Sequence, residues 1–283
     1  MATFTNFATL SYNGGTTTSN VVSGELLETL AATKIAVMDD YTAKDDVTYV
    51  VTLLNSGTAP LNGLTVTDDL GGYLFEGDTV YPLEYTNGSI HYYINGVLQA
   101  DPAVTAGPPL VITGISVPAG GNVMLIYEAT VTEFAPLAAD DTITNTAVVT
   151  GGGLAAPVTA SEIIETEDRA DLTISKAVSP AVVTENGQLT YTFVIANHGN
   201  TPAVATDDVV VSDVFDPILN PITVTFNGSV WAEGVNYTYD ESTGTFATLP
   251  GQITVPAATY TQNEDGTWIV NPGTVILTVT GTV

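Results

Sequence analysis

The chain contains two copies of one strand pattern, and the copies end differently. Residues 47–57 correspond to residues 189–199, and each segment closes in Asn-x-Gly before an apolar strand that ends in Asp68 or Asp213. Self-similarity over a period of this length indicates tandem domains. The first copy continues through a further strand at 143–151, whereas the second copy stops one strand earlier. We therefore predict that the second domain lacks its last strand.

The residue alternation predicts an all-β protein. Short stretches rich in Val, Ile, Thr and Tyr are separated by Gly, Pro, Asn and Asp, which is typical of strands and turns. The 283 residues suffice for two sandwich-sized domains. The predicted order is an N-terminal donor strand with its extension (1–20), a linker (21–30), the first β-sandwich (31–160), a second linker (161–170) and the second β-sandwich (171–283).

A segment that resembles the missing strand stands at the other end of the chain. Residues 4–12 match residues 143–151, with Thr-Asn and Ala at the same places. An open sheet edge exposes unpaired N–H and C=O groups, so proteins rarely leave one uncovered. A donor strand from another subunit would cover it, and repetition of this head-to-tail contact gives a homopolymer. The alternative is that residues 1–12 fold back onto their own second domain. The donor row would be Phe4, Asn6, Ala8 and Leu10.

Each predicted domain points three polar side chains toward its core, because residues of one parity along a strand share a face. Burying an unpaired ammonium or carboxylate costs several kcal/mol, so these groups should meet one another. If the first and last strands of a sandwich lie side by side, the lysine and the asparagine come into contact. The inward residues are Lys34, Asp68 and Asn145 in the first domain, and Lys176, Asp213 and the Asn6 of another subunit in the second.

These groups are suited to forming a covalent crosslink. Burial lowers the pKa of a lysine and raises that of an aspartic acid, so the amine becomes a nucleophile while the acid polarises the carboxamide. Asp68 and Asp213 would be the general acid/base residues, and loss of ammonia would leave an isopeptide bond. The alternative is a buried ion pair without covalent chemistry. Glu128 falls opposite the apolar row of its strand and is predicted to be a surface residue. The predicted bonds are Lys34–Asn145 within a subunit and Lys176–Asn6 between subunits.

Charge and composition argue against several function classes. Four basic residues against 31 acidic ones give a net charge of −27, which repels nucleic acid and anionic lipid. We expect no membrane insertion, because no apolar run is long enough to span a bilayer, and no signal peptide, because the N-terminus lacks a basic start and an apolar stretch. Zero cysteines exclude disulfides and thiolate chemistry. His91 and His198 occur in unrelated contexts, so we expect no enzyme acting on an external substrate.

Two further features have a structural and a functional interpretation. Acidic pairs such as Asp39-Asp40 and Asp207-Asp208 are the best case for calcium, but they lack the spacing of a known calcium loop and are more typical of solvated turns. We expect no cofactor and no metal. Trp231 and Trp268 would suit a sugar-binding platform, although aromatic residues in strands more often belong to the core.

The combined motifs resemble the DUF11-type repeat domains of bacterial surface proteins. The resemblance is carried by a first-strand lysine, a Tyr-x-apolar strand ending in Asn-x-Gly, a Thr/Ser-Asp after an apolar strand and a late Thr-Asn-x-Ala, and it covers most of both repeats. It implies immunoglobulin-like sandwiches in a structural surface module. The chain is also similar to the filament subunits of clostridial spore appendages, which implies an extracellular appendage on the endospore surface. A monomeric surface adhesin that binds carbohydrate or protein is the alternative.

Overall fold

The computed structural model describes residues 2–26 and 29–283, which fold into two compact units. Nearly all regular structure is β-strand, and the helical element in the described part is a short 3-10 turn, η1 (Ala205–Asp207). No helix among these residues is long and apolar enough to span a bilayer. The all-β prediction is confirmed. The first unit contains the chain up to Ala135 together with Thr142–Glu165, and the second contains Pro136–Asp141 together with Thr166–Val283.

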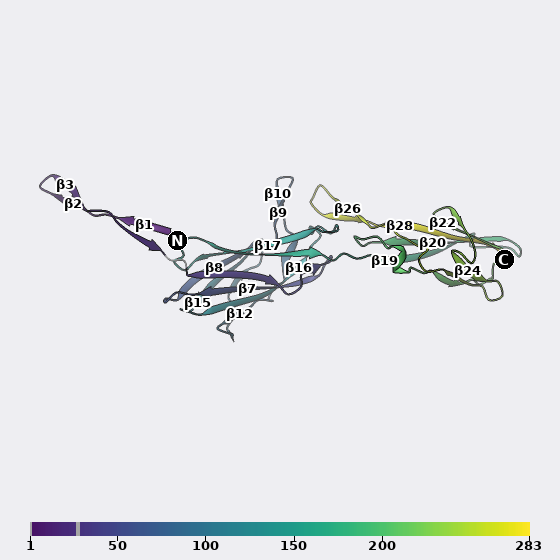
Figure 1. Cartoon of the computed structure of the whole chain (residues 1–283), viewed down its shortest axis with the longest axis horizontal. Helices are drawn as coiled ribbons and strands as arrows, with labels where there is room; N and C mark the ends of the chain where they lie inside the picture. Colours follow the sequence, from purple (N-terminus) through teal and green to yellow (C-terminus); the bar gives the residue numbers. More distant parts are fainter. Residues whose placement is uncertain (1, 27–28) are drawn as a thin grey trace. The chain divides into compact units, whose positions relative to one another are not determined.

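Two antiparallel sheets build the first unit (Figure 1). One sheet follows the order β13-β12-β16-β7-β5, and β11 also pairs with β16. The other follows the order β14-β15-β8-β17-β18-β6, and β9 and β10 form a separate hairpin. The first sheet consists of β5 (Leu30–Ala36), β7 (Asp46–Asn55), β11 (Leu83–Tyr85), β12 (His91–Ile94), β13 (Val97–Leu98) and β16 (Asn122–Val131). The second consists of β6 (Asp40–Tyr41), β8 (Leu61–Asp68), β14 (Ala103–Thr105), β15 (Leu110–Val117), β17 (Thr142–Gly151) and β18 (Val158–Thr166), and the hairpin of β9 (Tyr73–Phe75) and β10 (Asp78–Val80).

The first sandwich differs from the prediction at its last strand. β17 is followed by β18, which occupies much of the segment expected to be a linker and pairs with β17 over its length. The alternation of β18 is hard to read in the sequence because Glu162 lies on its inner row and the exposed Ile163 on its outer row, while Ala160 and Ile164 are buried. In addition, β17 and β5 belong to different sheets, so they face each other across the core instead of lying side by side in one sheet.

The Asn-x-Gly segment has the same structural role in both units. Asn55 accepts the N–H of Gly57 at 2.9 Å and donates to the carbonyl of Ala59 at 2.8 Å. Asn197 repeats these bonds with Gly199 at 2.9 Å and Thr201 at 2.8 Å. Both asparagine side chains are fully buried, so they satisfy the backbone of the turn that follows a central strand. The shared bonds explain why this motif is repeated in the sequence.

The second unit has one complete sheet and one short sheet. The larger sheet follows the order β19-β20-β28-β22-β23, and the smaller follows β21-β25-β24. Phe215 and Phe246 are at the centre of the apolar core between them. The larger sheet consists of β19 (Leu172–Ser179), β20 (Gln188–Asn197), β22 (Ile222–Phe226), β23 (Ser229–Trp231) and β28 (Gly273–Thr282). The smaller consists of β21 (Ser212–Val214), β24 (Tyr237–Asp240) and β25 (Thr245–Thr248), and β26 (Thr259–Gln262) pairs with β27 (Trp268–Asn271) in a separate hairpin.

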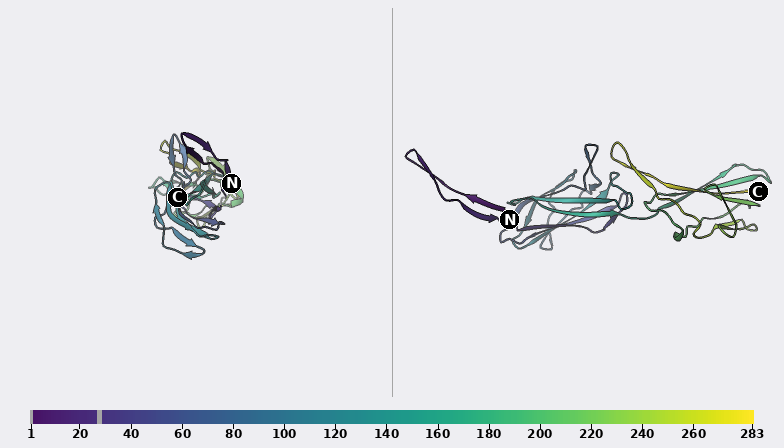
Figure 2. Two further views of the ribbon diagram at one scale, coloured as in Figure 1. Left: turned by 90° about the vertical axis from the view of Figure 1, so that its left-hand side faces the viewer. Right: turned by 45° about the horizontal axis from the view of Figure 1, so that its top comes forward.

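The N-terminal residues form a hairpin of their own, drawn in purple in Figures 1 and 2. β1 (Ala2–Asn6) pairs with β4 (Val22–Leu26), and β2 (Thr9–Tyr12) pairs with β3 (Gly15–Thr18). Its tip is Asn13-Gly14, whose φ values of 44° and 79° fit a two-residue type I′ turn. The segment 21–30, expected to be a linker, thus contains the strand β4, while its residues 27 and 28 lie outside the described residues, as does Met1 of the predicted donor segment.

Candidate functional site

Three polar side chains meet in the core of the first unit. Lys34 comes from β5, Asp68 from the end of β8 and Asn145 from β17, and Lys34, the most exposed of them, is 4% exposed. Each lies on the inward parity of its strand, and Ala147, two residues after Asn145, is directly opposite Asp68 in the β17–β8 ladder. The structure therefore brings together the three residues that the sequence predicts for this domain. Together with Tyr49 and Tyr127, they are called the first-unit site below.

The Asp68 carboxylate is the centre of the first-unit site. Its Oδ2 accepts hydrogen bonds from the Lys34 Nζ and from the Tyr127 hydroxyl, each at 2.5 Å, and its Oδ1 accepts the N–H of Leu70 at 3.1 Å. The Lys34–Asp68 pair is completely removed from solvent. A buried ion pair is tolerated only when further hydrogen bonds satisfy its remaining polar atoms, and these bonds provide them for the carboxylate.

Two tyrosines surround the ammonium group of Lys34. Tyr49 of β7 and Tyr127 of β16 are opposite each other in their ladder, and their stacked rings are 5.7 Å apart between centroids. The Lys34 Nζ lies 4.7 Å from the Tyr49 centroid and 6.0 Å from that of Tyr127, within the range of a cation–π interaction. Neither tyrosine is among the site residues predicted from the sequence. The signal was present, because Tyr127 shares the parity of the apolar residues Val123 and Leu125.

Burial shifts the pKa values of this site. Desolvation lowers the pKa of Lys34, and the nearby Asp68 opposes that change without cancelling it. Burial also raises the pKa of Tyr49 and that of Tyr127, so both phenols remain protonated at neutral pH. The site thus holds an amine whose neutral form is easier to reach than in water, next to a carboxylate that can take its proton.

Asn145 is the unsatisfied member of the site. Its carboxamide lies beside the hydroxyls of Tyr49 and Tyr127, in a position that counters the rise of both tyrosine pKa values. Nevertheless, neither its Oδ1 nor its Nδ2 makes a hydrogen bond of acceptable geometry, and both atoms are buried, as is the unpaired Tyr49 hydroxyl. Leaving a buried polar group without partners costs about 1–3 kcal/mol. An unpaired carboxamide contributes little to packing at this energetic cost. Its position in the same site as a desolvated amine is better suited to a group that reacts with that amine.

The second unit repeats the lysine and the aspartate in a more open setting. Lys176 of β19 donates to the Oδ2 of Asp213 in β21, but the lysine side chain is 40% exposed and the aspartate side chain 18%. The Lys176 Nζ lies 4.4 Å from the centroid of Tyr191, the counterpart of Tyr49. Val279 is opposite Tyr191 where Tyr127 is opposite Tyr49, so a valine stands at the position from which a phenol donates to Asp68 in the first unit. These residues, with the nearby Phe215, are called the second-unit site.

The inner face of β19 is uncovered in the second unit. Ile174 is 56% exposed and Val178 is 44% exposed, although both share the inward parity of Lys176. Their counterpart strand β5 buries Leu30 and Ala36 on the same face. In the first unit β17 covers that face, and no strand of the described residues takes its place in the second.

The sheet edge beside the second-unit site is also open, because among the described residues β21 pairs with β25 alone. Val211 exchanges bonds with Thr248 on the β25 side, which directs the N–H groups of Val210 and Ser212 to the other side. The N–H of Val214 bonds to the side chain of its neighbour Asp213, whereas its counterpart in the first unit donates to β17. The segment 209–214 is called the open edge.

The donor residues are found in the N-terminal hairpin. Asn6 pairs with Val22 in the β1–β4 ladder, and Phe4 and Leu10 are each more than half exposed. Ala8 exchanges hydrogen bonds with Ser19. In this single chain, residues 2–12 therefore pair with the returning strands of the hairpin and not with β21. This arrangement differs from the alternative in which the segment folds back onto its own second domain.

The remaining candidate residues have other surroundings. Glu128 is exposed on β16, in agreement with its prediction as a surface residue. In the described ranges 2–26 and 29–283, no three His, Asp or Glu side chains gather closely enough to hold a metal ion. Asp207, from one of the acidic pairs, accepts the N–H of Val204 within a turn. Trp231 stacks on Phe226 with centroids 4.8 Å apart.

No protein-family model and no curated protein matches this sequence. Among solved structures, the chain is similar to the major pilin subunit BcpA of Bacillus cereus, with 13% identity and a TM-score of 0.37 over 96% of this chain and 73% of that one. It is also similar to the 35 kDa C-terminal fragment of the major pilin GBS80 of Streptococcus agalactiae, with 12% identity and a TM-score of 0.36 over 87% of this chain and 91% of that one. A third similar structure is the pilus backbone RrgB of Streptococcus pneumoniae, with 12% identity and a TM-score of 0.35 over 87% of this chain and 55% of that one. The chain spans about half of RrgB. Likenesses this distant carry no argument about function.

Proposed function

We propose that this protein is the structural subunit of a surface filament, in which the N-terminal segment of one copy completes the second unit of the next. The open edge and the uncovered face of β19 carry this proposal. The first unit supports it, because β17 there occupies the place that is open in the second unit and has the same sequence pattern as residues 4–12. Addition of a strand to a sheet edge is an established docking mode, and a head-to-tail contact propagates into a filament.

The β17–β8 ladder serves as the template for the register that we propose for the donated strand. In the first unit Ala147 is opposite Asp68 and Val149 is opposite Val66. Carried over to the second unit, that register places Ala8 opposite Asp213. Asn6 then occupies the position that Asn145 has beside Lys34, and the inward row of the donor covers Ile174 and Val178. In this register the donated strand would cover the second-unit site and pair with the open edge at the same time.

We further propose that both sites form Lys–Asn isopeptide bonds. The lysine transfers one proton to the aspartate, its neutral Nζ attacks the Cγ of the carboxamide, and the aspartic acid returns that proton to the departing nitrogen. The aspartate then takes the second proton that Nζ loses as the new amide forms. The C–N bond of the carboxamide breaks as the new amide bond forms, and one ammonia leaves. The reaction uses groups already in the site and needs no other reactant, so a dry pocket and the fixed geometry are sufficient. Lys34 would join Asn145 within a subunit, and Lys176 would join Asn6 of the next.

The resemblance to DUF11-type repeats and to clostridial spore appendage subunits supports the location of such a filament outside the cell, on the endospore surface. The net charge of −27 would keep the polymer soluble and separated from other anionic surfaces. A monomeric adhesin is the competing function, and the assembly state of the purified protein separates the two.

Electrophoresis after boiling in detergent tests this function. We expect a ladder of covalent multimers, and peptide mass spectra with one ammonia lost at each bond. Lys176→Met and Asn6→Ala should each abolish the ladder while leaving fibres that dissociate in detergent. Ser175→Ala and Thr5→Ala are matched controls, since both residues are exposed neighbours on the same strands. An unchanged ladder in Lys176→Met would contradict the bond assignment, and a uniform monomer under native conditions would favour the adhesin.

A further inference from the structure

We propose that the donated element is the whole hairpin of residues 2–26, which docks on another copy as two strands, with Tyr12 anchored in a cleft at its tip. This inference rests on the proposed filament function and identifies the part of the partner copy that is recognised. The first unit motivates it, because two consecutive strands, β17 and β18, occupy the place that is empty in the second unit. A single donated strand would replace β17 and leave the position of β18 open.

The N-terminal hairpin matches the β17–β18 hairpin in the part of its ladder that joins β1 to β4. Thr142 is opposite Glu165 in the first unit, and at the corresponding position Thr3 is opposite Glu25. The two ladders remain aligned at the next positions, where Asn145 is opposite Glu162 and Asn6 is opposite Val22. The match therefore extends from residues 4–12 to the returning strand β4, which the sequence comparison did not include.

The hairpin is preformed with an apolar inner face. Phe4 is opposite Gly24, and a Cβ added at that glycine would lie 2.5 Å from the phenyl ring. Ile143 and Ile164 are opposite each other at the equivalent place in the first unit, where both are buried. One large side chain over a glycine thus replaces two medium ones. The phenyl ring is held by β4, so β4 takes part in shaping the face that docks.

The second unit also offers a partner for the returning strand. In the first unit the N–H of Glu165 in β18 donates to the carbonyl of Asp39 at 2.9 Å, next to β6. The corresponding residue in the second unit is Ala181, five positions after Lys176 as Asp39 is five after Lys34. This segment is exposed, and Val182 beside it is 87% exposed. Glu25 of a docked hairpin would therefore lie next to Ala181.

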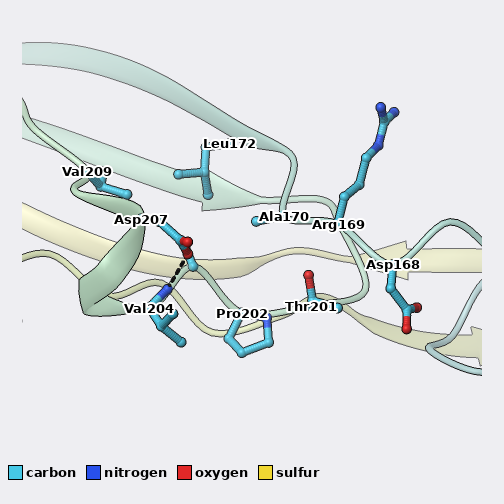
Figure 3. A pocket seen from close by; sticks show the side chains of 10 residues that line it. Asp168, Arg169, Ala170, Leu172, Thr201, Pro202, Val204, Asp207 and Val209 are labelled. Atoms are coloured by element: carbon cyan, nitrogen blue, oxygen red, sulfur yellow. Dashed lines mark hydrogen bonds between the residues drawn. The ribbon is translucent and has the colours of Figure 1, made fainter.

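A cleft of about 580 Å³ lies where the tip of the docked hairpin would arrive. Tyr12 corresponds to Gly151, which is opposite Leu64 in the first unit, and the counterpart of Leu64 is Val209. Val209 and Leu172 line the cleft, and Arg169 points away from it (Figure 3). Among the other residues around it are Ala170, Pro202, Thr201 and Asp207.

The cleft is suited to a tyrosine side chain, whereas the internal hairpin has a glycine at the corresponding position. Leu172, Val209 and Pro202 supply an apolar wall for the ring, and the oxygens of Thr201 and Asp207 supply acceptors for the hydroxyl. Tyr12 shares the inward parity of the donor row and is 61% exposed in the free hairpin. At the equivalent place in the first unit Gly151 has no side chain, and a Cβ there would lie 2.8 Å from the carbonyl oxygen of Gly63. The tip position therefore distinguishes the intersubunit hairpin from the internal one.

Engineered cysteine pairs test the two-strand docking, because the chain has no cysteine of its own. In a Lys176→Met background, the pair Thr9→Cys with Ser212→Cys reports the first strand, and Glu25→Cys with Ala181→Cys reports the second. Directly opposed strand residues have Cα atoms close enough for a disulfide. We expect both pairs to give multimers that reductant dissolves. Multimers from the first pair alone would overturn the hairpin and leave the filament intact, whereas multimers from neither would overturn the donor docking itself.

The cleft has a separate test in reassembly of Lys176→Met chains from denaturant. Tyr12→Ala should raise the protein concentration needed for assembly about tenfold or more, as expected for a ring that loses its burial, and Tyr12→Phe should retain most of the affinity. Thr16→Ala, near the tip on the returning strand, is the matched control. A normal assembly threshold for Tyr12→Ala would overturn the role of the cleft. Failure of both Tyr12→Ala and Thr16→Ala would instead show that the tip tolerates no change, which also removes the assignment to the cleft.

Discussion

Replacing Asn145 with alanine separates a covalent first-unit site from a simple ion pair. The change removes the electrophile and leaves the Lys34–Asp68 pair with its hydrogen bonds from Tyr127 and Leu70. If the isopeptide bond forms, the parent protein lacks one ammonia in the first unit, and Asn145→Ala shows no such loss.

The two interpretations predict opposite changes in the free energy of unfolding. A bond between Lys34 and Asn145 closes a loop of about 110 residues, for which chain entropy gives roughly 4.7 kcal/mol of stabilisation. Asn145→Ala would therefore destabilise the first unit by about 4–5 kcal/mol. Without the bond, the substitution removes a buried carboxamide that has no hydrogen-bond partner, which recovers about 1–3 kcal/mol against a small cavity cost. The net change would then be close to zero or stabilising.

Urea unfolding of the full chain gives the measurement with an internal reference. Both tryptophans, Trp231 and Trp268, lie in the second unit, so their fluorescence reports that unit and should not change. Hydrogen exchange of β7 and β16 reports the first unit. Thr144→Ala, an exposed neighbour on β17, should stay within about 0.5 kcal/mol of the parent protein. An Asn145→Ala protein as stable as the parent, or more stable, would refute the crosslink.

Three further predictions test other parts of the structure. Because desolvation lowers the pKa of Lys34, the native chain gives up this proton at a lower pH than the unfolded chain does, so the stability of the Asn145→Ala first unit should rise as the pH increases toward 10.5; urea midpoints that fall as the pH is raised toward that value would contradict the cause given. Gly24→Val should displace the Phe4 ring and weaken assembly about tenfold, as measured by light scattering. Gly15→Ala should assemble normally, because the added Cβ would lie 3.6 Å from its nearest neighbour, the carbonyl oxygen of Tyr12. Equal assembly of the two variants would argue against the packed hairpin face. Ser212→Pro removes an N–H of the open edge and should stop assembly, while the tryptophan emission of the folded second unit persists. Ser212→Ala keeps this N–H and should assemble normally. Fibres from the proline variant would show that this edge is not used.

The two sites differ in the charges that surround the lysine. The first-unit site is complete within one chain, and Asp69 and Glu162 add to the field that favours the charged form of Lys34. At the corresponding positions the second unit has Val214, and the donated hairpin has Val22 opposite Asn6. Docking would therefore bury Lys176 with a single carboxylate partner.

Parity along the strands was the part of the sequence that predicted the site. Alternation alone placed Lys34, Asp68 and Asn145 on inward faces, because the side-chain period of a strand is two and an apolar row marks the buried side. The same alternation failed at β18, where Glu162 is on the inner row and Ile163 on the outer row. It also did not reveal that β4 returns along β1, although Asn13-Gly14 is a strong local signal for a hairpin turn.

By itself, the sequence determined the all-β class, the two copies of one domain and the polar residues directed inward, since these depend on local alternation and on repetition within the chain. Tertiary structure alone decided which sheet each strand joins, that Tyr127 joins Lys34 in donating to Asp68, and that Asn145 is left without a hydrogen bond. These features depend on contacts between segments far apart in the chain. The packing of two sheets against each other sets such contacts, and no local pattern records them.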